Sequence, residues 1–102
     1  MKKYQKQVDE WISQNKYGYF KPLEILARLT EEVGELAREI NHRFGPKKKK
    51  TSETENDLGD EMADIIYTVI CLANSQNIDL DTHLKRILKK YDTRDKDRWE
   101  KK

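Results

Sequence analysis

The stretch LGDEMADIIYTVICLA, at residues 58–73, decides the fold. From Met62 onward it is apolar almost all round, and only Asp64 and Thr68 interrupt the run. A helix of this composition is buried on several sides, which makes it the central helix of the domain. We expect it to start near residues 56–57, because acidic residues are favoured in a first helical turn.

Three further helices are predicted around the central one. Apolar side chains recur at helical spacing over residues 4–12. Pro22 and the pair Gly45-Pro46 mark the start and the stop of a second helix. Asp79 or Asp81 can cap a fourth helix, and no stretch of the sequence favours a strand. The sequence therefore predicts an all-α, four-helix bundle-like fold.

The composition predicts one small domain that is incomplete alone. The 102 residues fit a single unit over 1–102, with a lysine-rich loop at 47–56 and a charged, flexible tail at 95–102. Charged residues make up 39% of the chain and hydrophobic residues 35%, which is lean for a self-sufficient core. We therefore expect dimerisation or tetramerisation to complete the bundle.

Charge and cysteine usage limit the location and the partners. The formal net charge of only +2 gives no basis for expecting nucleic acid as a partner. The chain shows no secretory signal, and its longest apolar run is too short for a bilayer, so a membrane is not expected either. Cys71 cannot form an intramolecular disulfide and is expected to be an inert, buried thiol. These features predict a cytoplasmic protein.

Two carboxylate pairs stand out on the second and third helices. On a helical wheel, Glu32 borders the apolar arc of one helix and Glu35 follows on the same side, while Glu61 borders the arc of the other and Asp64 lies just beyond it. If the two arcs pack antiparallel, four carboxylates converge on one partly buried point. Convergence of like charges requires a cation, and oxygen-only ligands select Mg²⁺ or Mn²⁺ over zinc.

The competing interpretation is a solvated acidic face. It suits Glu24, Glu31 and Glu39, because carboxylates are common on helix surfaces. Asp64 argues against it, since this residue lies in the most apolar run of the chain and a buried carboxylate must be paired or bind a metal. The sequence therefore favours a metal site in which Asp64 is the most informative ligand.

The motifs resemble a known family. EEVGE at 31–35 followed by EMAD at 61–64 is similar to the EExxE…ExxD pattern of the MazG-type nucleotide pyrophosphohydrolases. These enzymes belong to the all-α NTP pyrophosphatase superfamily. The agreement runs from about Trp11 to Trp99, includes PLEILARL at 22–29 and NHRFGP at 41–46, and is nearest to the short, single-domain branch called YpjD-like.

The resemblance implies a reaction and a set of roles. It implies hydrolysis of a nucleoside triphosphate between the α- and β-phosphates, giving a nucleoside monophosphate and pyrophosphate in the housecleaning of nucleotide pools. It also implies subunits that dimerise or pair as dimers. By analogy, Glu31 orients or deprotonates the attacking water, and Mg²⁺ is held by Glu32, Glu35, Glu61 and Asp64. Basic side chains of the last helix would contact the phosphates, the candidates being Lys85, Lys89, Lys90 and Arg94. Many relatives carry an Asn near this point, where this chain has Tyr91-Asp92.

Other residues leave alternatives open. Trp11, Tyr17 and Phe20 could stack on a nucleobase, as aromatic residues do in relatives, or could be core residues. Lys47–Lys50 fits a solvated loop or a lid over the phosphates. A rival to the enzyme is a non-catalytic helical module that binds a nucleotide or a protein.

Overall fold

The computed structural model describes residues 1–46, 57–95 and 98–99. In this part of the chain there are four helices and no strand: α1 (Lys2–Ile12), α2 (Pro22–Phe44), α3 (Leu58–Ser75) and α4 (Leu80–Arg94). The predicted all-α fold with four helices is confirmed. The predicted loop at 47–56 lies outside the described residues, as does most of the predicted tail at 95–102.

Side chains that cap the helices explain where the helices begin. The Asp57 carboxylate accepts hydrogen bonds from the backbone N–H groups of Gly59 and Asp60, so α3 starts at the predicted place. Asp79, rather than Asp81, caps α4. In α2, Pro22 occupies the first turn, and the backbone N–H before it donates to the Glu24 carboxylate at 3.0 Å. These local contacts set the residues at which α2, α3 and α4 begin.

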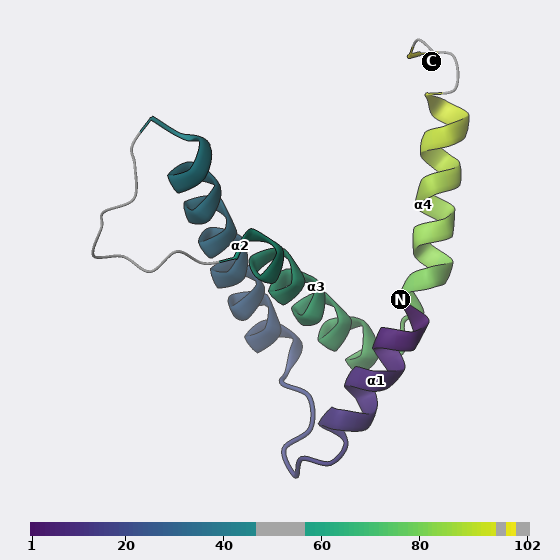
Figure 1. The fold of residues 1–102 in the computed structure, drawn as a ribbon. Helices are drawn as coiled ribbons and strands as arrows, with labels where there is room; N and C mark the ends of the chain where they lie inside the picture. The colour runs from purple at the N-terminus through teal and green to yellow at the C-terminus, as the bar shows by residue number, and fades with distance from the viewer. Residues whose placement is uncertain (47–56, 96–97, 100–102) are drawn as a thin grey trace.

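The helices are arranged unequally (Figure 1). α2 packs along α3, α1 packs against α3, and α4 extends away from the other three. The buried hydrophobic residues of the described chain are only Ile25, Ile70 and Ala73. The core thus lies among α1, α2 and α3, because α3 contacts both of the other two helices.

The central helix is less covered than its sequence predicted. Met62, Ile66 and Tyr67 of α3 are between 41% and 48% exposed, so the expectation that α3 is buried on several sides is wrong for a single chain. The apolar stripe of α4 is likewise uncovered. One chain supplies too few neighbours to cover these faces. Among the described helices, none is long and apolar enough to cross a membrane.

Candidate active site

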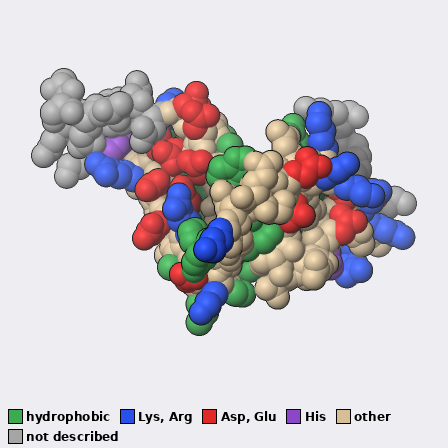
Figure 2. Space-filling view, turned by 90° about the horizontal axis from the view of Figure 1, so that it is seen from below, with side chains coloured by type: hydrophobic (Ala, Val, Ile, Leu, Met, Phe, Trp, Pro, Cys, Tyr) green, Lys and Arg blue, Asp and Glu red, His purple; other side chains and the backbone are tan. Residues whose placement is uncertain are grey.

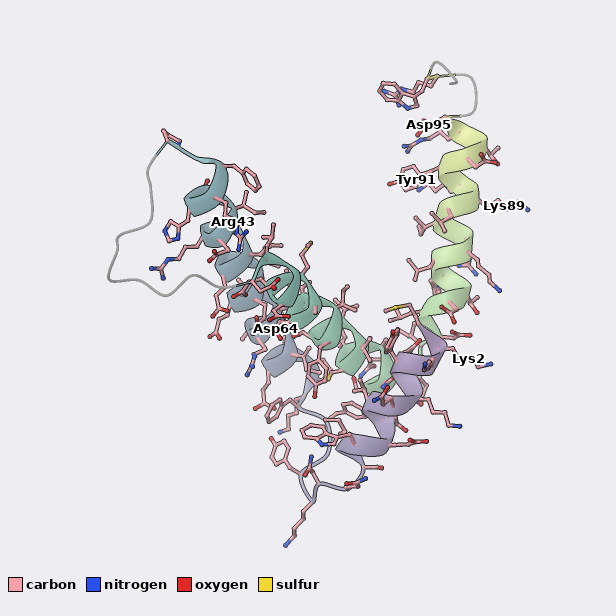
Figure 3. All side chains as sticks on the ribbon, viewed as in Figure 1. Lys2, Arg43, Asp64, Lys89, Tyr91 and Asp95 are labelled. Atoms are coloured by element: carbon pink, nitrogen blue, oxygen red, sulfur yellow. The ribbon has the colours of Figure 1, made fainter. Side chains whose placement is uncertain are left out.

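Three of the four predicted carboxylates meet where α2 and α3 cross. Glu32 of α2 and Glu61 and Asp64 of α3 each offer an oxygen, and these oxygens lie within 4.8 Å of one another. Figure 3 shows Asp64 at the crossing of the two helices. The spacing of three residues between Glu61 and Asp64 puts both on one face of α3, as the wheel predicted.

Two members of this cluster are buried and lack partners for part of their charge. Glu32 and Glu61 are each 7% exposed, and the Oε2 atom of each has no hydrogen-bond partner among the described residues. Buried carboxylate oxygens are normally hydrogen-bonded or bound to a cation. The donor set, made of oxygens alone, fits a hard divalent cation. The cluster therefore has the buried, unpartnered oxygen atoms that a site for a divalent cation requires.

The electrostatics of Glu61 support the same conclusion. Burial raises the pKa of Glu61, and the negative charges of Glu35, Asp64, Glu32 and Glu39 raise it further. The charged form of Glu61 is therefore disfavoured, and a bound cation would offset that cost. The burial of these carboxylates and the repulsion between them therefore favour the binding of a cation at this site.

Asp64 and Glu35 differ from expectation in their surroundings. Asp64 is exposed, so the argument that it must be buried because its neighbours are apolar is wrong. Glu35 is also exposed and does not belong to the three-carboxylate cluster, although its charge is the largest neighbouring influence on the pKa of Glu61. The role of Glu35 as a fourth ligand stays a prediction.

Of the glutamates that suit a solvated face, Glu31 is exposed as expected and Glu39 is buried. Glu31 is exposed on α2, and its role toward water stays a prediction. Glu39 was expected on a solvated face, yet it is only 3% exposed and lies 3.5 Å from Nε of Arg43. The signal was available, because Glu39 follows Glu32 by seven residues, which is two helical turns on the same face.

A cavity of about 380 Å³ adjoins the carboxylates. Aromatic residues of α1 and the following turn form one wall, where Tyr17 and Phe20 meet edge to face with ring centroids 5.3 Å apart. Gly18 makes the turn with φ of 75°, a conformation that side chains other than glycine rarely adopt. The lining includes Trp11, Ile12, Asn15, Tyr17, Gly18, Tyr19, Phe20, Ile25, Arg28, Glu32, Asp64, Tyr67, Thr68 and Cys71.

The two open alternatives for Trp11 are separated by this cavity. Trp11 is 58% exposed and lines the cavity, so it is not a core residue of the single chain. Cys71, expected to be buried, is only half-buried on the opposite wall. Burial raises the pKa of its thiol, which keeps it protonated and unreactive.

A hydrogen-bond network holds the cavity wall. The Tyr19 hydroxyl donates to Asp9 Oδ1 at 2.7 Å and accepts from Asn74 Nδ2 at 2.9 Å. Burial and the bond to Asp9 raise the pKa of Tyr19 to about 12, so the hydroxyl stays a donor at neutral pH. Asn74 and Gln5 are bonded to each other in turn, which links the wall to α3. Sequence patterns gave no sign of this network, because its members are far apart in the chain.

The predicted phosphate contacts are not brought to the site of the same chain. Lys85, Lys89, Lys90 and Arg94 are exposed on α4, which leads away from the carboxylates (Figure 1), and Figure 3 shows Lys89 on the outer side of that helix. Arg94 instead lies over the ring of Tyr91 at 4.7 Å. In Figure 2 basic side chains lie at both ends of the molecule, and those at the end that carries α4 are interspersed with acidic ones.

Known proteins resemble this chain in sequence and in fold. Residues 20–99 match the family model of the MazG nucleotide pyrophosphohydrolase domain. The chain is 51% identical over 102 residues to the uncharacterized protein YpjD of Bacillus subtilis (strain 168), which covers 100% of this chain and 92% of YpjD.

Two solved structures are similar as well. The crystal structure of YpjD from Bacillus subtilis superposes with a TM-score of 0.79 at 48% identity, over 88% of this chain and 92% of that one. The crystal structure of the Bacillus-conserved MazG protein, a nucleotide pyrophosphohydrolase, gives a TM-score of 0.79 at 48% identity, over 94% of this chain and 93% of that one. With the carboxylate cluster and the cavity beside it, these matches show that the chain belongs to the MazG nucleotide pyrophosphohydrolase family.

Proposed function

We propose that this chain hydrolyses nucleoside triphosphates to a nucleoside monophosphate and pyrophosphate, and does so with Mg²⁺ held by Glu32, Glu35, Glu61 and Asp64. One observation carries the proposal. A cluster of three carboxylates, two of them buried and each with an unpartnered oxygen, reaches an aromatic cavity of about 380 Å³ through Glu32 and Asp64. A cation site next to an apolar cavity suits a ligand with a charged end and a flat apolar end, such as a nucleotide. Mn²⁺ has similar ligand preferences and would substitute.

The residues divide the work of the reaction. The aromatic wall with Trp11 would stack the base, and the carboxylates would hold a divalent cation, which neutralises phosphate oxygens and lowers the pKa of water. Glu31 would orient the water that attacks the α-phosphorus, and the bond from that phosphorus to the α–β bridging oxygen breaks. Pyrophosphate leaves with that oxygen. No covalent nucleophile is required, because phosphoryl transfer depends mainly on positioning and charge neutralisation.

We also propose that the working unit is a dimer or tetramer. The α4 stripe, with Leu84, Ile87, Leu88 and Tyr91, is between 43% and 67% exposed in the single chain. A second copy could cover this face and bring Lys85, Lys89, Lys90 or Arg94 toward phosphates bound by its neighbour. Such a unit would act on the nucleotide pool of the cytoplasm.

The test is a panel of ribo- and deoxynucleoside triphosphates with Mg²⁺, in which pyrophosphate and monophosphate are both measured. We expect equal amounts of the two products from at least one nucleotide, and none in EDTA. Asp64→Asn should lower kcat at least about 100-fold, because it removes charge from the cation site. Asp60→Asn, four residues earlier on α3 and exposed, is the matched control and should keep full activity. Binding of nucleotides without turnover across the whole panel would instead support the non-catalytic module.

A further inference from the structure

Arg28 is a charged residue of the cavity to which the proposed function gives no role. It lies on α2 one turn before Glu32, and its Nε donates to Glu32 Oε1 at 3.2 Å. Its side chain is 63% exposed and lines the cavity. Because Nε holds Oε1, the unpartnered Oε2 of Glu32 is left for the cation. One guanidinium thus touches both the cavity and a residue of the carboxylate cluster.

The order of residues along the two helices fixes where Arg28 would meet a nucleotide. Along α2 the cavity is lined by Ile25, then Arg28, then Glu32, and along α3 in the reverse direction by Cys71, then Tyr67 and Thr68, then Asp64. The apolar end of each series lies toward the aromatic wall, and the acidic end is the cation site. Arg28 stands at the middle level, about 6 Å along the helix from Glu32.

The charge of Arg28 also reaches the opposite wall. Burial and the neighbouring Cys71 raise the pKa of Tyr67, and the guanidinium of Arg28 acts against that rise. The positive charge of Arg28 on α2 therefore influences the Tyr67 hydroxyl on α3, across the cavity. A nucleotide with its base against the aromatic wall and its outer phosphates at the cation would place its α-phosphate at this level.

The simple alternative is a surface ion pair between residues i and i+4, which contributes little to stability. Two observations separate Arg28 from such a pair. Its partner Glu32 is buried rather than exposed, and only Nε is engaged. The two terminal amino groups of the guanidinium form no hydrogen bond with the described residues. A planar fork with free donors beside a nucleotide-sized cavity is a typical phosphate ligand.

We propose that Arg28 binds the α-phosphate of the nucleotide through its terminal amino groups while its Nε holds Glu32. The assignment rests on the proposed function for the identity of the ligand. It makes Arg28 the residue that distinguishes a nucleotide from the corresponding nucleoside. The assignment also explains why the positively charged Arg28 lies on the cavity side of a carboxylate cluster that is proposed to bind Mg²⁺.

The test compares ligands with and without the α-phosphate. Affinities of the four deoxynucleosides and of their 5′-monophosphates are measured with Mg²⁺ for the wild type, Arg28→Ala, Arg28→Lys and the control Arg86→Ala, an exposed arginine on α4. Arg28→Ala should weaken monophosphate binding roughly tenfold to hundredfold, the range for a hydrogen bond to a charged group. Nucleoside affinity should stay within threefold. Arg28→Lys should recover part of the loss, because lysine keeps the charge but not the fork.

Further measurements separate this role from a structural one. Mn²⁺ affinity, followed by electron paramagnetic resonance, should not fall in Arg28→Ala, because the loss of a positive charge beside Glu32 favours cation binding. The kcat/KM for the best triphosphate should fall with the monophosphate affinity. Equal losses for nucleoside and monophosphate, or a parallel loss of Mn²⁺ binding, would overturn the assignment. A wild type that binds monophosphate through Arg28 but hydrolyses nothing would overturn the proposed function alone. Full hydrolysis by Arg28→Ala with unchanged monophosphate affinity would overturn the assignment of Arg28 and leave the proposed function in place.

Discussion

Glu61 and Glu32 show how burial, more than position in the sequence, defines a cation ligand. Both come from polar borders of their helices, and both are removed from water where α2 and α3 cross. Asp64, surrounded by apolar residues in the sequence, faces solvent instead. The free-energy cost of burying charge at this site therefore arises mainly from the two glutamates. Their substitution should change the stability of the metal-free protein most clearly.

Glu61→Gln should stabilise the metal-free protein at neutral pH while it abolishes hydrolysis. The pKa of Glu61 is raised in the folded state, first by burial and then by its acidic neighbours. Between the unfolded and the folded pKa the native state binds more protons, so stability falls as pH rises through this window. Glutamine has the shape without the charge, and should therefore raise Tm in EDTA at pH 8 but leave it nearly unchanged at the acid end of the window.

Thermal melts of both proteins across this pH range, with and without Mg²⁺, check the prediction. Mg²⁺ should raise the Tm of the wild type more than that of Glu61→Gln, since only the wild type has the full repulsion to relieve. A variant that melts at the same temperature as the wild type at every pH in EDTA would show that the charge of Glu61 does not destabilise the folded state. Glu10→Gln, on the exposed face of α1, is the matched control.

At the scale of residues, the sequence predicted the ligand types and their helix faces but not their burial. A wheel places Glu32 and Glu61 at the borders of apolar arcs and Asp64 just beyond, and there a rotation of a few tens of degrees decides between core and solvent. The sequence places Arg28 only within a family-like stretch, because nothing in an i, i+4 pair shows that a cavity lies beside it. Glu39 was assigned to solvent although its spacing from Glu32 matched the buried face.

At the scale of elements, Gln5 fixes the junction of three helices. Its side chain is 9% exposed. Its Nε2 donates to Asn74 Oδ1 at 2.9 Å and to the carbonyl oxygen of Ile78 at 2.8 Å, and its Oε1 accepts from the backbone N–H of Leu80 at 2.9 Å. One amide thus joins α1 to the end of α3 and to the first turn of α4.

Gln5→Ala should destabilise the protein by about 1–3 kcal/mol, the cost of leaving buried polar groups unsatisfied. The backbone N–H of Leu80 and the Oδ1 atom of Asn74 would lose their partner together. The Nδ2 atom of Asn74 would keep its bonds to the backbone carbonyl of residue 5 and to the Tyr19 hydroxyl. Urea unfolding measures the change. The neighbouring Gln7→Ala, at an exposed position of the same helix, should change stability by less than about 0.5 kcal/mol. Equal effects of the two substitutions would contradict this role.

The elements were the most predictable part of the structure. Apolar periodicity and the caps at Pro22, Asp57 and Asp79 are local signals, so the helices begin where the sequence indicated. The Gln5 network was not predictable, because it joins residues 69 to 75 positions apart. Long-range polar contacts leave no periodic mark in a sequence.

At the scale of the whole molecule, one chain does not form a compact body. Its radius of gyration is 17.5 Å, against about 13 Å for a compact domain of 100 residues. The lean composition predicted an incomplete core. It could not show that the deficit lies on α4 and on one face of α3, since an apolar stripe looks the same whether its own chain or another covers it.

Leu88→Glu should shift the protein toward monomers, because it places a charge on the stripe of α4, where Leu88 is 67% exposed in the single chain. Light scattering after gel filtration measures the mass. Tm should rise with protein concentration for the wild type and become independent of it in the variant. Thr93→Glu adds the same charge on the other side of α4 and should leave the mass unchanged. A wild-type protein that is monomeric at all concentrations would contradict the proposed assembly.

The phase of α3 has a consequence for how this chain can vary in length. Glu61 and Asp64 face Glu32 only because one unbroken helix keeps them in register, and each added residue would rotate all that follows by about 100°. Substitutions can be absorbed one at a time, whereas a single insertion between residues 61 and 71 would separate the carboxylates from the cavity that they adjoin. Insertions and deletions among homologues should therefore avoid this segment and fall at the helix ends, such as the turn at residues 76–79.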